Sequence, residues 1–262
     1  MATAYERVRI ARGAKRPTGI DYLQNVFHGF FELHGDRRYA DDPAIVGGLA
    51  YLGATPVTVI AIEKGHTAKE RVQRGFGAPQ PEGYRKALRL MRQAEKFQRP
   101  VVCFVDTSGA GCNVGAEERG QGEAIAECLT TMSALQTPVL SILIGEGGSG
   151  GALALAAGDR VWMLENAVYS VISPEGCATI LWKDAAKAEQ AAEELKLTAD
   201  DALALGVVES VIPEAGLGEP EFYDALAQRL MREVDALSAM PVNQLLAARY
   251  ARFRRFGGEA QR

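Results

Sequence analysis

The chain has 262 residues, of which 47% are hydrophobic and 24% are charged, and its formal net charge is −4. This is enough for one large domain or two small ones with a full core. The negative charge argues against general nucleic-acid binding, and the absence of any run of about 18 apolar residues argues against a membrane span. The first residues lack the apolar stretch of an export signal, and the four scattered cysteines show no C-x-x-C spacing. We therefore expect a cytoplasmic protein with no metal site and no disulfides of its own.

The first third of the chain predicts a mixture of helix, strand and loop. Residues 1–20 carry five basic side chains and little periodicity, which predicts a loose basic arm. Apolar residues at helical spacing predict a helix over Asp21–His34. Two apolar stretches around a short glycine-containing turn predict a hairpin of Ala44–Tyr51 and Pro56–Ile62. A polar loop over Lys64–Gly83 follows.

From Gly83 onward, the pattern alternates between helices and buried strands. The predicted elements are a helix over Gly83–Phe97, a strand over Pro100–Val105, a helix over Ala116–Leu135, strands over Thr137–Ile144, Val161–Leu164 and Ala167–Val171, a helix that opens at Ser173, helices over Asp184–Leu195 and Ala199–Leu205, a strand over Val207–Ile212, and two helices over Glu221–Phe256 that break near Pro241. Strands that alternate with crossover helices predict a mainly parallel sheet.

The most informative segment is Leu140–Ala157, which joins a β-branched apolar run to a helical pattern through five glycines within seven residues. Glycines leave backbone N–H groups uncovered at the start of the new helix. This predicts an anion or oxyanion site built from the backbone. A second glycine loop, Asp106–Gly111, follows the preceding strand, so one N–H from each loop could meet at a single oxygen.

Other motifs fit the same segment. Gly145–Gly150 matches the G-x-G-x-x-G of dinucleotide folds, but it stands past the middle of the chain and the helix after it is short. Gly147–Gly151 matches the G-x-S-x-G of α/β-hydrolases, which need a histidine after the serine, and all three histidines precede it. The Lys-Ser/Thr of a Walker A loop is missing. A tight turn without function is a further alternative.

The window Lys64–Arg99 holds ten basic and three acidic residues in a chain of negative net charge. Such a window is typical either of a solvated helix face or of a surface that meets a phosphorylated substrate or an acidic partner. Both alternatives stay open from the residues alone.

Several long motifs make the chain recognisable. They are Glu32-Leu-His-Gly-Asp-Arg37, Ala40-Asp-Asp-Pro43, Pro81-Glu-Gly-Tyr-Arg-Lys-Ala-Leu-Arg-Leu90, Gly115-Ala-Glu-Glu-Arg-Gly-Gln121, Gly145-Glu-Gly-Gly-Ser-Gly-Gly-Ala-Leu-Ala154 and Tyr169-Ser-Val-Ile-Ser-Pro-Glu-Gly-Cys177. In this order they closely resemble the carboxyltransferase alpha subunits of bacterial acetyl-CoA carboxylases, from about Asp21 to Pro213. The resemblance implies an α/β crotonase-like (ClpP/crotonase) spiral of repeated ββα units with flanking helices. It also implies one carboxyltransferase domain over residues 1–262, with an arm (1–20), a core (21–213) and C-terminal helices (214–262).

The resemblance implies a reaction and a set of partners. The carboxyl group of carboxybiotin, which is attached to a separate carrier protein, passes to acetyl-CoA and forms malonyl-CoA, the first committed step of fatty acid synthesis. The implied partners are a beta subunit with most of the acetyl-CoA site and a zinc ribbon, in an alpha2beta2 assembly, together with biotin carboxyl carrier protein and biotin carboxylase. This chain itself would bind no metal and no membrane.

The resemblance also carries over to individual residues. It implies a biotin oxyanion hole at Gly150 and Gly151, and the cofactor would be surrounded by Gly147, Gly148, Gly109, Ala110 and Gly115. Arg71 and Arg74 of the basic window are candidate contacts to the CoA nucleotide or another polyanion. No histidine follows His66 and neither glycine loop contains lysine. We therefore expect biotin itself, after loss of CO2, to supply the base while the protein stabilises oxyanions.

The first glycine loop departs from the family pattern. The family form resembles Pro-Gly-Ala-Tyr-Pro/Cys-Gly-Ile/Val-Gly, whereas this chain has Ser108-Gly-Ala-Gly111-Cys112-Asn113-Val-Gly115, without the proline and the aromatic wall. Three alternatives stay open beside the acetyl-CoA system. They are an alpha-type subunit of another biotin-dependent acyl-CoA carboxylase or decarboxylase, an NAD-dependent dehydrogenase, and a non-catalytic scaffold subunit.

Overall fold

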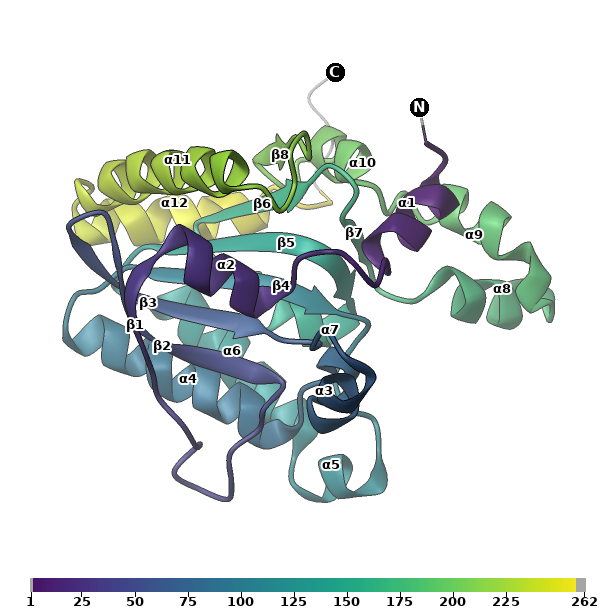
Figure 1. Cartoon of the computed structure of the whole chain (residues 1–262), viewed down its shortest axis with the longest axis horizontal. Coiled ribbons are helices and arrows are strands. Elements are labelled where there is room, and N and C mark those ends of the chain that lie inside the picture. The colour runs from purple at the N-terminus through teal and green to yellow at the C-terminus, as the bar shows by residue number, and fades with distance from the viewer. Residues whose placement is uncertain (1, 258–262) are drawn as a thin grey trace.

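An eight-stranded sheet forms the centre of the computed structural model, which describes residues 2–257 (Figure 1). Its strands are β1 (His28–Glu32), β2 (Ile45–Leu52), β3 (Thr55–Ile62), β4 (Val101–Thr107), β5 (Val139–Gly148), β6 (Arg160–Leu164), β7 (Val168–Ser170) and β8 (Ser210–Ile212). Their order is β1-β2-β3-β4-β5-β6-β8, and β7 pairs with the end of β5. The pairs β1–β2 and β2–β3 are antiparallel and all later pairs are parallel. The predicted mainly parallel sheet and its leading hairpin are confirmed.

Helices flank this sheet. They are α1 (Ala4–Ala11), α2 (Gly19–Val26), α3 (Ala68–Gln73), α4 (Pro81–Lys96), α5 (Val114–Glu118), α6 (Gln121–Ala134), α7 (Ser149–Leu153), α8 (Pro174–Trp182), α9 (Ala188–Glu194), α10 (Ala199–Ala204), α11 (Pro220–Ser238) and α12 (Val242–Arg254), with 3-10 turns η1 (Gly75–Gly77) and η2 (Ala185–Lys187). None of the helices in residues 2–257 is both long and apolar enough to span a bilayer. The predicted break near Pro241 is confirmed, and residues 258–262 of the predicted C-terminal segment lie outside the described residues.

The two faces of the sheet carry different helices, because successive side chains of a strand point to opposite sides. Phe104 of β4 stacks on Tyr22 of α2 with ring centroids 5.1 Å apart, and Tyr22 in turn meets Tyr223 of α11. α4 and α6 pack against each other, where Cys128 of α6 donates its S–H to the carbonyl oxygen of Tyr84 in α4. This layering holds the carboxyl ends of β4 and β5 in a fixed place.

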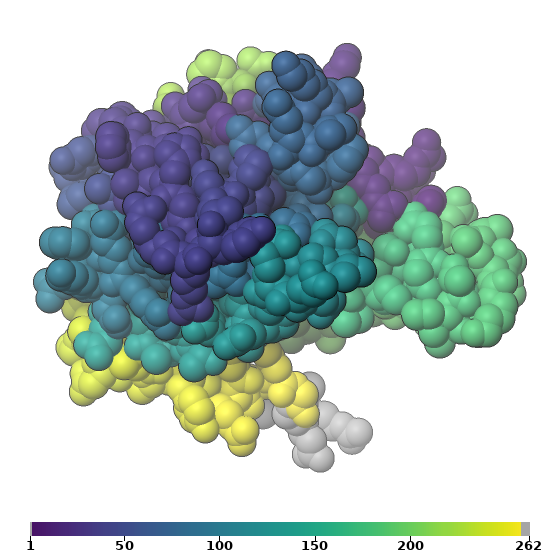
Figure 2. Space-filling model, turned by 90° about the horizontal axis from the view of Figure 1, so that it is seen from below, coloured from purple at the N-terminus to yellow at the C-terminus, as the bar shows by residue number. Residues whose placement is uncertain are grey.

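α8 and α9 stand off the main body as a lobe (Figures 1 and 2). The lobe has its own small apolar clusters, and α1 packs against α9. The N-terminal helix therefore joins the lobe to the sheet.

The predicted loose basic arm over residues 1–20 is wrong. A capping box at Thr3 starts α1, and Arg7 and Arg16 are buried. Arg7 pairs with Asp200 at 2.9 Å, and Arg16 pairs with Glu214. Basic residues without periodicity predicted a solvated segment. In the structure, these guanidinium groups form ion pairs with carboxylates that are distant in the sequence.

Other boundaries differ from the predictions as well: β5 extends to Gly148, β8 begins only at Ser210, and the helix predicted over Asp184–Leu195 is η2 followed by α9. Three further differences change an element. The helix predicted over Asp21–His34 ends at Val26, and β1 follows it. The predicted loop Lys64–Gly83 contains α3, which begins with a capping box at Thr67. The helix predicted over Ala116–Leu135 is divided into α5 and α6 because Gly120 adopts a left-handed φ of +79°.

Candidate active site

The second glycine loop turns directly from β5 into α7. β5 runs to Gly148, and α7 begins at Ser149, whose φ of +53° is left-handed. Gly150 and Gly151 lie in the first turn of α7, where backbone N–H groups have no partner inside the helix. Neither N–H finds an acceptor among residues 2–257. The loop therefore presents two available donors side by side.

The first glycine loop follows β4 and is closed by Thr107. The Oγ1 of Thr107 accepts the N–H of Gly109 at 3.0 Å and donates to the carbonyl oxygen of Gly109 at 2.8 Å. The N–H of Gly111 donates to the carbonyl oxygen of Pro79 at 2.9 Å. The N–H of Ala110, between them, has no acceptor in the described part of the chain. The N–H of Ala110 is therefore an available donor of this loop, whereas the N–H groups of Gly109 and Gly111 are engaged.

The two loops pack directly against each other, because β4 and β5 are parallel neighbours with Thr107 opposite Gly147. A Cβ at Gly148 would collide with the carbonyl oxygen of Ser108. A Cβ at Gly151 would lie 2.5 Å from the backbone nitrogen of Ala110. The expected approach of the two loops is confirmed, and it is close enough that glycine is required at both positions.

Tyr84 of α4 holds the second loop from inside. Its side chain is fully buried, and its hydroxyl donates to the carbonyl oxygen of Gly151 at 3.1 Å. Burial raises the pKa of Tyr84 well above its ordinary value, so the hydroxyl remains a protonated donor near neutral pH. The helix predicted over Gly83–Phe97 includes Tyr84, but the sequence does not indicate this contact.

The glycines predicted on the second loop line two different hollows. Gly147 and Gly148 line a narrow cavity beside Ser108. Gly150 lines an apolar hollow of about 310 Å³ together with Leu153. The predicted cluster is thus spread over two hollows that adjoin the same loop.

Gly115 lies apart from this arrangement, in α5. A Cβ at Gly115 would meet the side chains of Arg119 and Asn113 instead of the second glycine loop. The structure therefore brings Gly115 next to the outer end of the first loop.

A chain of charges, absent from the predicted site, joins the second loop to α1 and α8. Lys64 Nζ lies 2.5 Å from Asp106 and 3.1 Å from Glu146, and Arg12 lies 2.8 Å from both Glu146 and Glu175. Burial alone would raise the pKa of Glu146, but Lys64 and Arg12 outweigh it and hold this pKa below its ordinary value. Glu146 is therefore an ionised ion-pair partner near neutral pH and not a proton donor.

Of these charges, Arg12, Lys64, Asp106 and Glu146 line a cavity of about 210 Å³ at the carboxyl ends of β4 and β5. Phe76 lines the same cavity with a φ of +56°, which is rare for a bulky residue, and with a side chain that is 59% exposed. Arg71 also contributes to its wall.

Much of the basic window Lys64–Arg99 serves internal pairing. Lys86 is fully buried with its Nζ 2.5 Å from Asp41, and Arg85 pairs with Asp36 at 2.7 Å. The solvated-face alternative is wrong for these two basic residues, because α4 turns them toward acids of the loop between β1 and β2.

The two predicted substrate arginines differ in their surroundings. Arg71 borders the cavity and donates through Nε to the carbonyl oxygen of Gly65 at 3.1 Å. Arg74 donates through Nη1 to the carbonyl oxygen of Pro43 at 2.7 Å. Neither makes an ion pair with a residue of the described chain, so both guanidinium groups keep their charge available.

The histidines lie outside the glycine loops. His28 stacks on Tyr51, while His34 and His66 each lie 3.0 Å from an aspartate. Within residues 2–257, no three or more His, Cys, Asp or Glu side chains lie close enough together to hold a metal ion. Ser149 therefore has no imidazole base in its surroundings, which removes the hydrolase alternative.

Comparisons with known proteins agree with this geometry. A family model described as acetyl co-enzyme A carboxylase carboxyltransferase-like matches residues 1–257. The chain is 57% identical, over 97% of its length and 98% of the relative, to the acetyl-coenzyme A carboxylase carboxyl transferase subunit alpha of Ruminiclostridium cellulolyticum. It is also 54% identical to a protein of Natranaerobius thermophilus named as subunits beta/alpha of the same enzyme. This match covers 97% of the present chain and 43% of that longer protein. These matches confirm the resemblance inferred from the motifs.

A solved structure supports the fold. A chain of a Pseudomonas malonate decarboxylase hetero-tetramer in complex with coenzyme A superposes with a TM-score of 0.72 at 17% identity, over 91% of this chain and 98% of that one. With the parallel strand–loop–helix units, this match confirms the predicted crotonase-like fold.

Proposed function

The chain belongs to the family of acetyl-CoA carboxylase carboxyltransferase alpha subunits, and from this premise we propose that its glycine loops hold carboxybiotin while the carboxyl group passes to acetyl-CoA. The single observation that carries this proposal is a set of three N–H groups without an acceptor in the described chain, on Ala110 and Gly151 where the two loops meet and on the adjacent Gly150.

These donors suit a ligand whose carbonyl oxygen gains negative charge. Backbone N–H groups in a partly buried turn are fixed in advance, so they stabilise such charge without reorganisation. Tyr84 holds the carbonyl oxygen of Gly151 and so fixes the peptide plane that follows it. Carboxybiotin, when bound, supplies the carboxyl group and the base, and the residues of this chain bind, orient and stabilise.

The remaining expectations about the assembly belong to the same proposal. The beta subunit supplies most of the acetyl-CoA site and a zinc ribbon in an alpha2beta2 complex, and biotin carboxylase and the carrier protein deliver carboxybiotin in the cytoplasm. The fused beta/alpha relative from Natranaerobius thermophilus supports the pairing of the two subunits. The family match gives no support to the dehydrogenase alternative, and the five-residue α7 is too short for a dinucleotide fold.

The purified chain alone is expected to lack transcarboxylation activity and to gain it when the beta subunit is added. The reason is that the glycine loops offer a biotin site, while most of the acyl-CoA site lies on the partner. The measurement is malonyl-CoA:biocytin transcarboxylation with each subunit alone and with both. Robust turnover by the isolated chain, with contaminating partner excluded, would contradict the proposal.

Charge reversal at the cavity tests the proposed nucleotide contact. Arg71→Glu is expected to raise the KM for malonyl-CoA several-fold, with little change in the KM for biocytin and a weaker dependence on salt, because Arg71 lines the cavity. Arg74→Glu serves as the matched variant and is expected to have a smaller effect, since Arg74 does not line this cavity and its guanidinium lies at the carbonyl oxygen of Pro43. Unchanged kinetics in both variants would mean that these arginines do not contact substrate.

A further inference from the structure

Gln80 fills the space beside Gly111 in the first glycine loop. A Cβ at Gly111 would collide with the side-chain amide of Gln80 and would lie 3.3 Å from the carbonyl oxygen of Pro79. The amide can occupy this place only because residue 111 has no side chain. The family form carries an aromatic residue here, so in this chain the loop is packed in another way.

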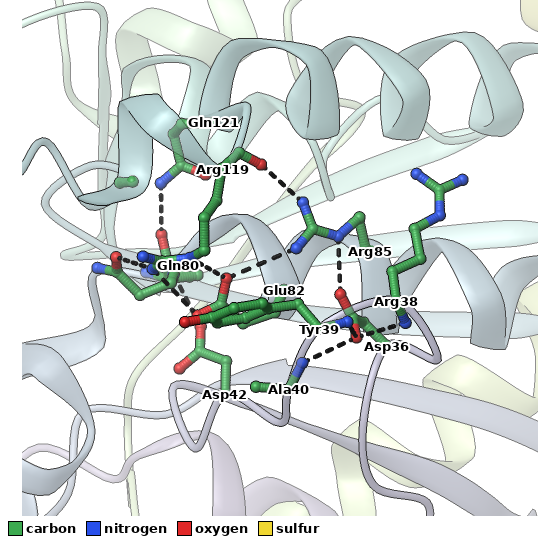
Figure 3. A network of polar contacts seen from close by, with 12 residues as sticks. Asp36, Arg38, Tyr39, Ala40, Asp42, Gln80, Glu82, Arg85, Arg119 and Gln121 are labelled. Carbon is green, nitrogen blue, oxygen red and sulfur yellow. Dashed lines mark hydrogen bonds and ion pairs between the residues drawn. The ribbon is translucent and has the colours of Figure 1, made fainter. Parts of the chain in front are cut away.

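The amide of Gln80 is tied to the outer end of the loop. Its Oε1 accepts from Asn113 Nδ2 at 3.3 Å and from Arg119 Nη2 at 3.2 Å. Its backbone N–H donates to Asp42 Oδ2 at 2.8 Å, which fixes the start of α4. Figure 3 shows Gln80 within this network, with Arg119 and Gln121 reaching toward it.

The backbone beside Gln80 holds the loop as well. The carbonyl oxygen of Pro79 accepts the N–H of Gly111 at 2.9 Å and the Nε2 of Gln121 at 2.8 Å. The same Nε2 donates to the carbonyl oxygen of Gly111 at 2.9 Å. Residues 79–80 therefore anchor the stretch 111–113, just as Thr107 anchors Gly109 at the other end.

Ala110 lies between these two anchors, its backbone nitrogen is beside Gly151, and its N–H has no acceptor in the described part of the chain. We propose that Gln80 is a positioning residue, which sets the place of the Ala110 N–H through its contacts with Gly111 and Asn113. This inference rests on the proposed function, in which that N–H faces the biotin oxygen. Gln80, Gly111 and Asn113 then act as one unit, and the departures of this loop from the family pattern are coupled.

The coupling predicts a non-additive pair of substitutions. Gln80→Ala removes the amide, while Gly111→Ala displaces it, because a methyl group would occupy its place and the flexible side chain can swing away. In the complex with the beta subunit, each variant is expected to lower kcat/KM for biocytin about tenfold, the size of one or two lost hydrogen bonds. The double variant is expected to be no worse than either single variant. The KM for malonyl-CoA should stay unchanged.

Hydrogen–deuterium exchange on the same proteins gives a readout that does not require activity. Both single variants are expected to speed exchange in residues 108–113 and to leave residues 139–144 of β5 unchanged. Gln228→Ala, at an exposed glutamine of α11, is the matched control and should change neither exchange nor kinetics.

The outcomes separate the positioning role from the proposed function. If the wild-type complex transfers carboxyl groups but Gln80→Ala changes neither exchange in the loop nor kcat/KM for biocytin, Gln80 does not position Ala110. If the effects of the two substitutions multiply, the residues act independently and the inference is wrong. A wild-type complex without transcarboxylation overturns the proposed function, while faster exchange in the variants would still show that Gln80 anchors the loop.

Discussion

Gly151→Val is expected to abolish transcarboxylation by the assembled enzyme. A Cβ at residue 151 would lie 2.5 Å from the nitrogen of Ala110 and 2.8 Å from the hydroxyl of Tyr84, so a β-branched side chain forces the two loops apart. The loss of even one oxyanion donor costs about 10²–10³ in rate, and separation of the loops disturbs the donors on both. The measurement is kcat for malonyl-CoA:biocytin transcarboxylation after confirming that the variant still binds the beta subunit.

Two neighbouring substitutions serve as controls. Gly150→Ala is expected to keep most activity, because a Cβ there would meet Ile125 at 3.7 Å, an ordinary contact, and would leave the N–H in place. Ser149→Ala is also expected to keep most activity, since no histidine lies beside this serine to make it a nucleophile. Near-full activity of Gly151→Val would show that the oxyanion hole is not formed by this loop. Loss of transcarboxylation in Ser149→Ala would instead favour a nucleophilic role for this serine.

The glycine loops could be predicted because their signal is local. Strand, glycines and helix follow one another within about 18 residues at Leu140–Ala157, and a parallel sheet places the ends of neighbouring strands together. What sequence could not show is which N–H groups stay available. The N–H of Gly109 is engaged by Thr107, whereas the N–H of Ala110 is not, and this depends on the side-chain rotamer of Thr107.

The features that were missed depend on pairs of residues far apart in the chain. The side chain of Arg12 reaches Glu146 and Glu175, more than 130 residues away, and Lys64 reaches Asp106. A single sequence shows five basic residues near the start but not the carboxylates that face them. The same holds for β1, whose short exposed pattern is recognised as a strand only because β2 pairs with it.

Arg249 of α12 presents the most demanding case of such long-range pairing. Its guanidinium is 1% exposed, and its Nε and Nη2 each lie 2.8 Å from an oxygen of Asp159, which is itself buried. The remaining N–H groups donate to carbonyl oxygens at the end of α6 and just beyond it, namely those of Met132, Leu135 and Thr137. A helix leaves its last carbonyl groups without hydrogen-bond partners. The buried guanidinium therefore supplies donors to carbonyl groups at the end of α6 and neutralises a buried carboxylate at the same time.

Arg249→Met is therefore expected to destabilise the fold by about 3–5 kcal/mol, because it leaves the Asp159 carboxylate and three carbonyl groups buried without their partner. For a chain of this size, that corresponds to a fall in Tm of roughly 10 °C. Urea denaturation and thermal melting of the purified chain measure it, and Arg254→Met, at an exposed arginine of the same helix, should change the midpoint little. Adding Asp159→Asn to Arg249→Met should recover part of the loss, since the unpaired charge is then removed. Equal midpoints for Arg249→Met and Arg254→Met would show that the buried pair does not hold α12 to the sheet.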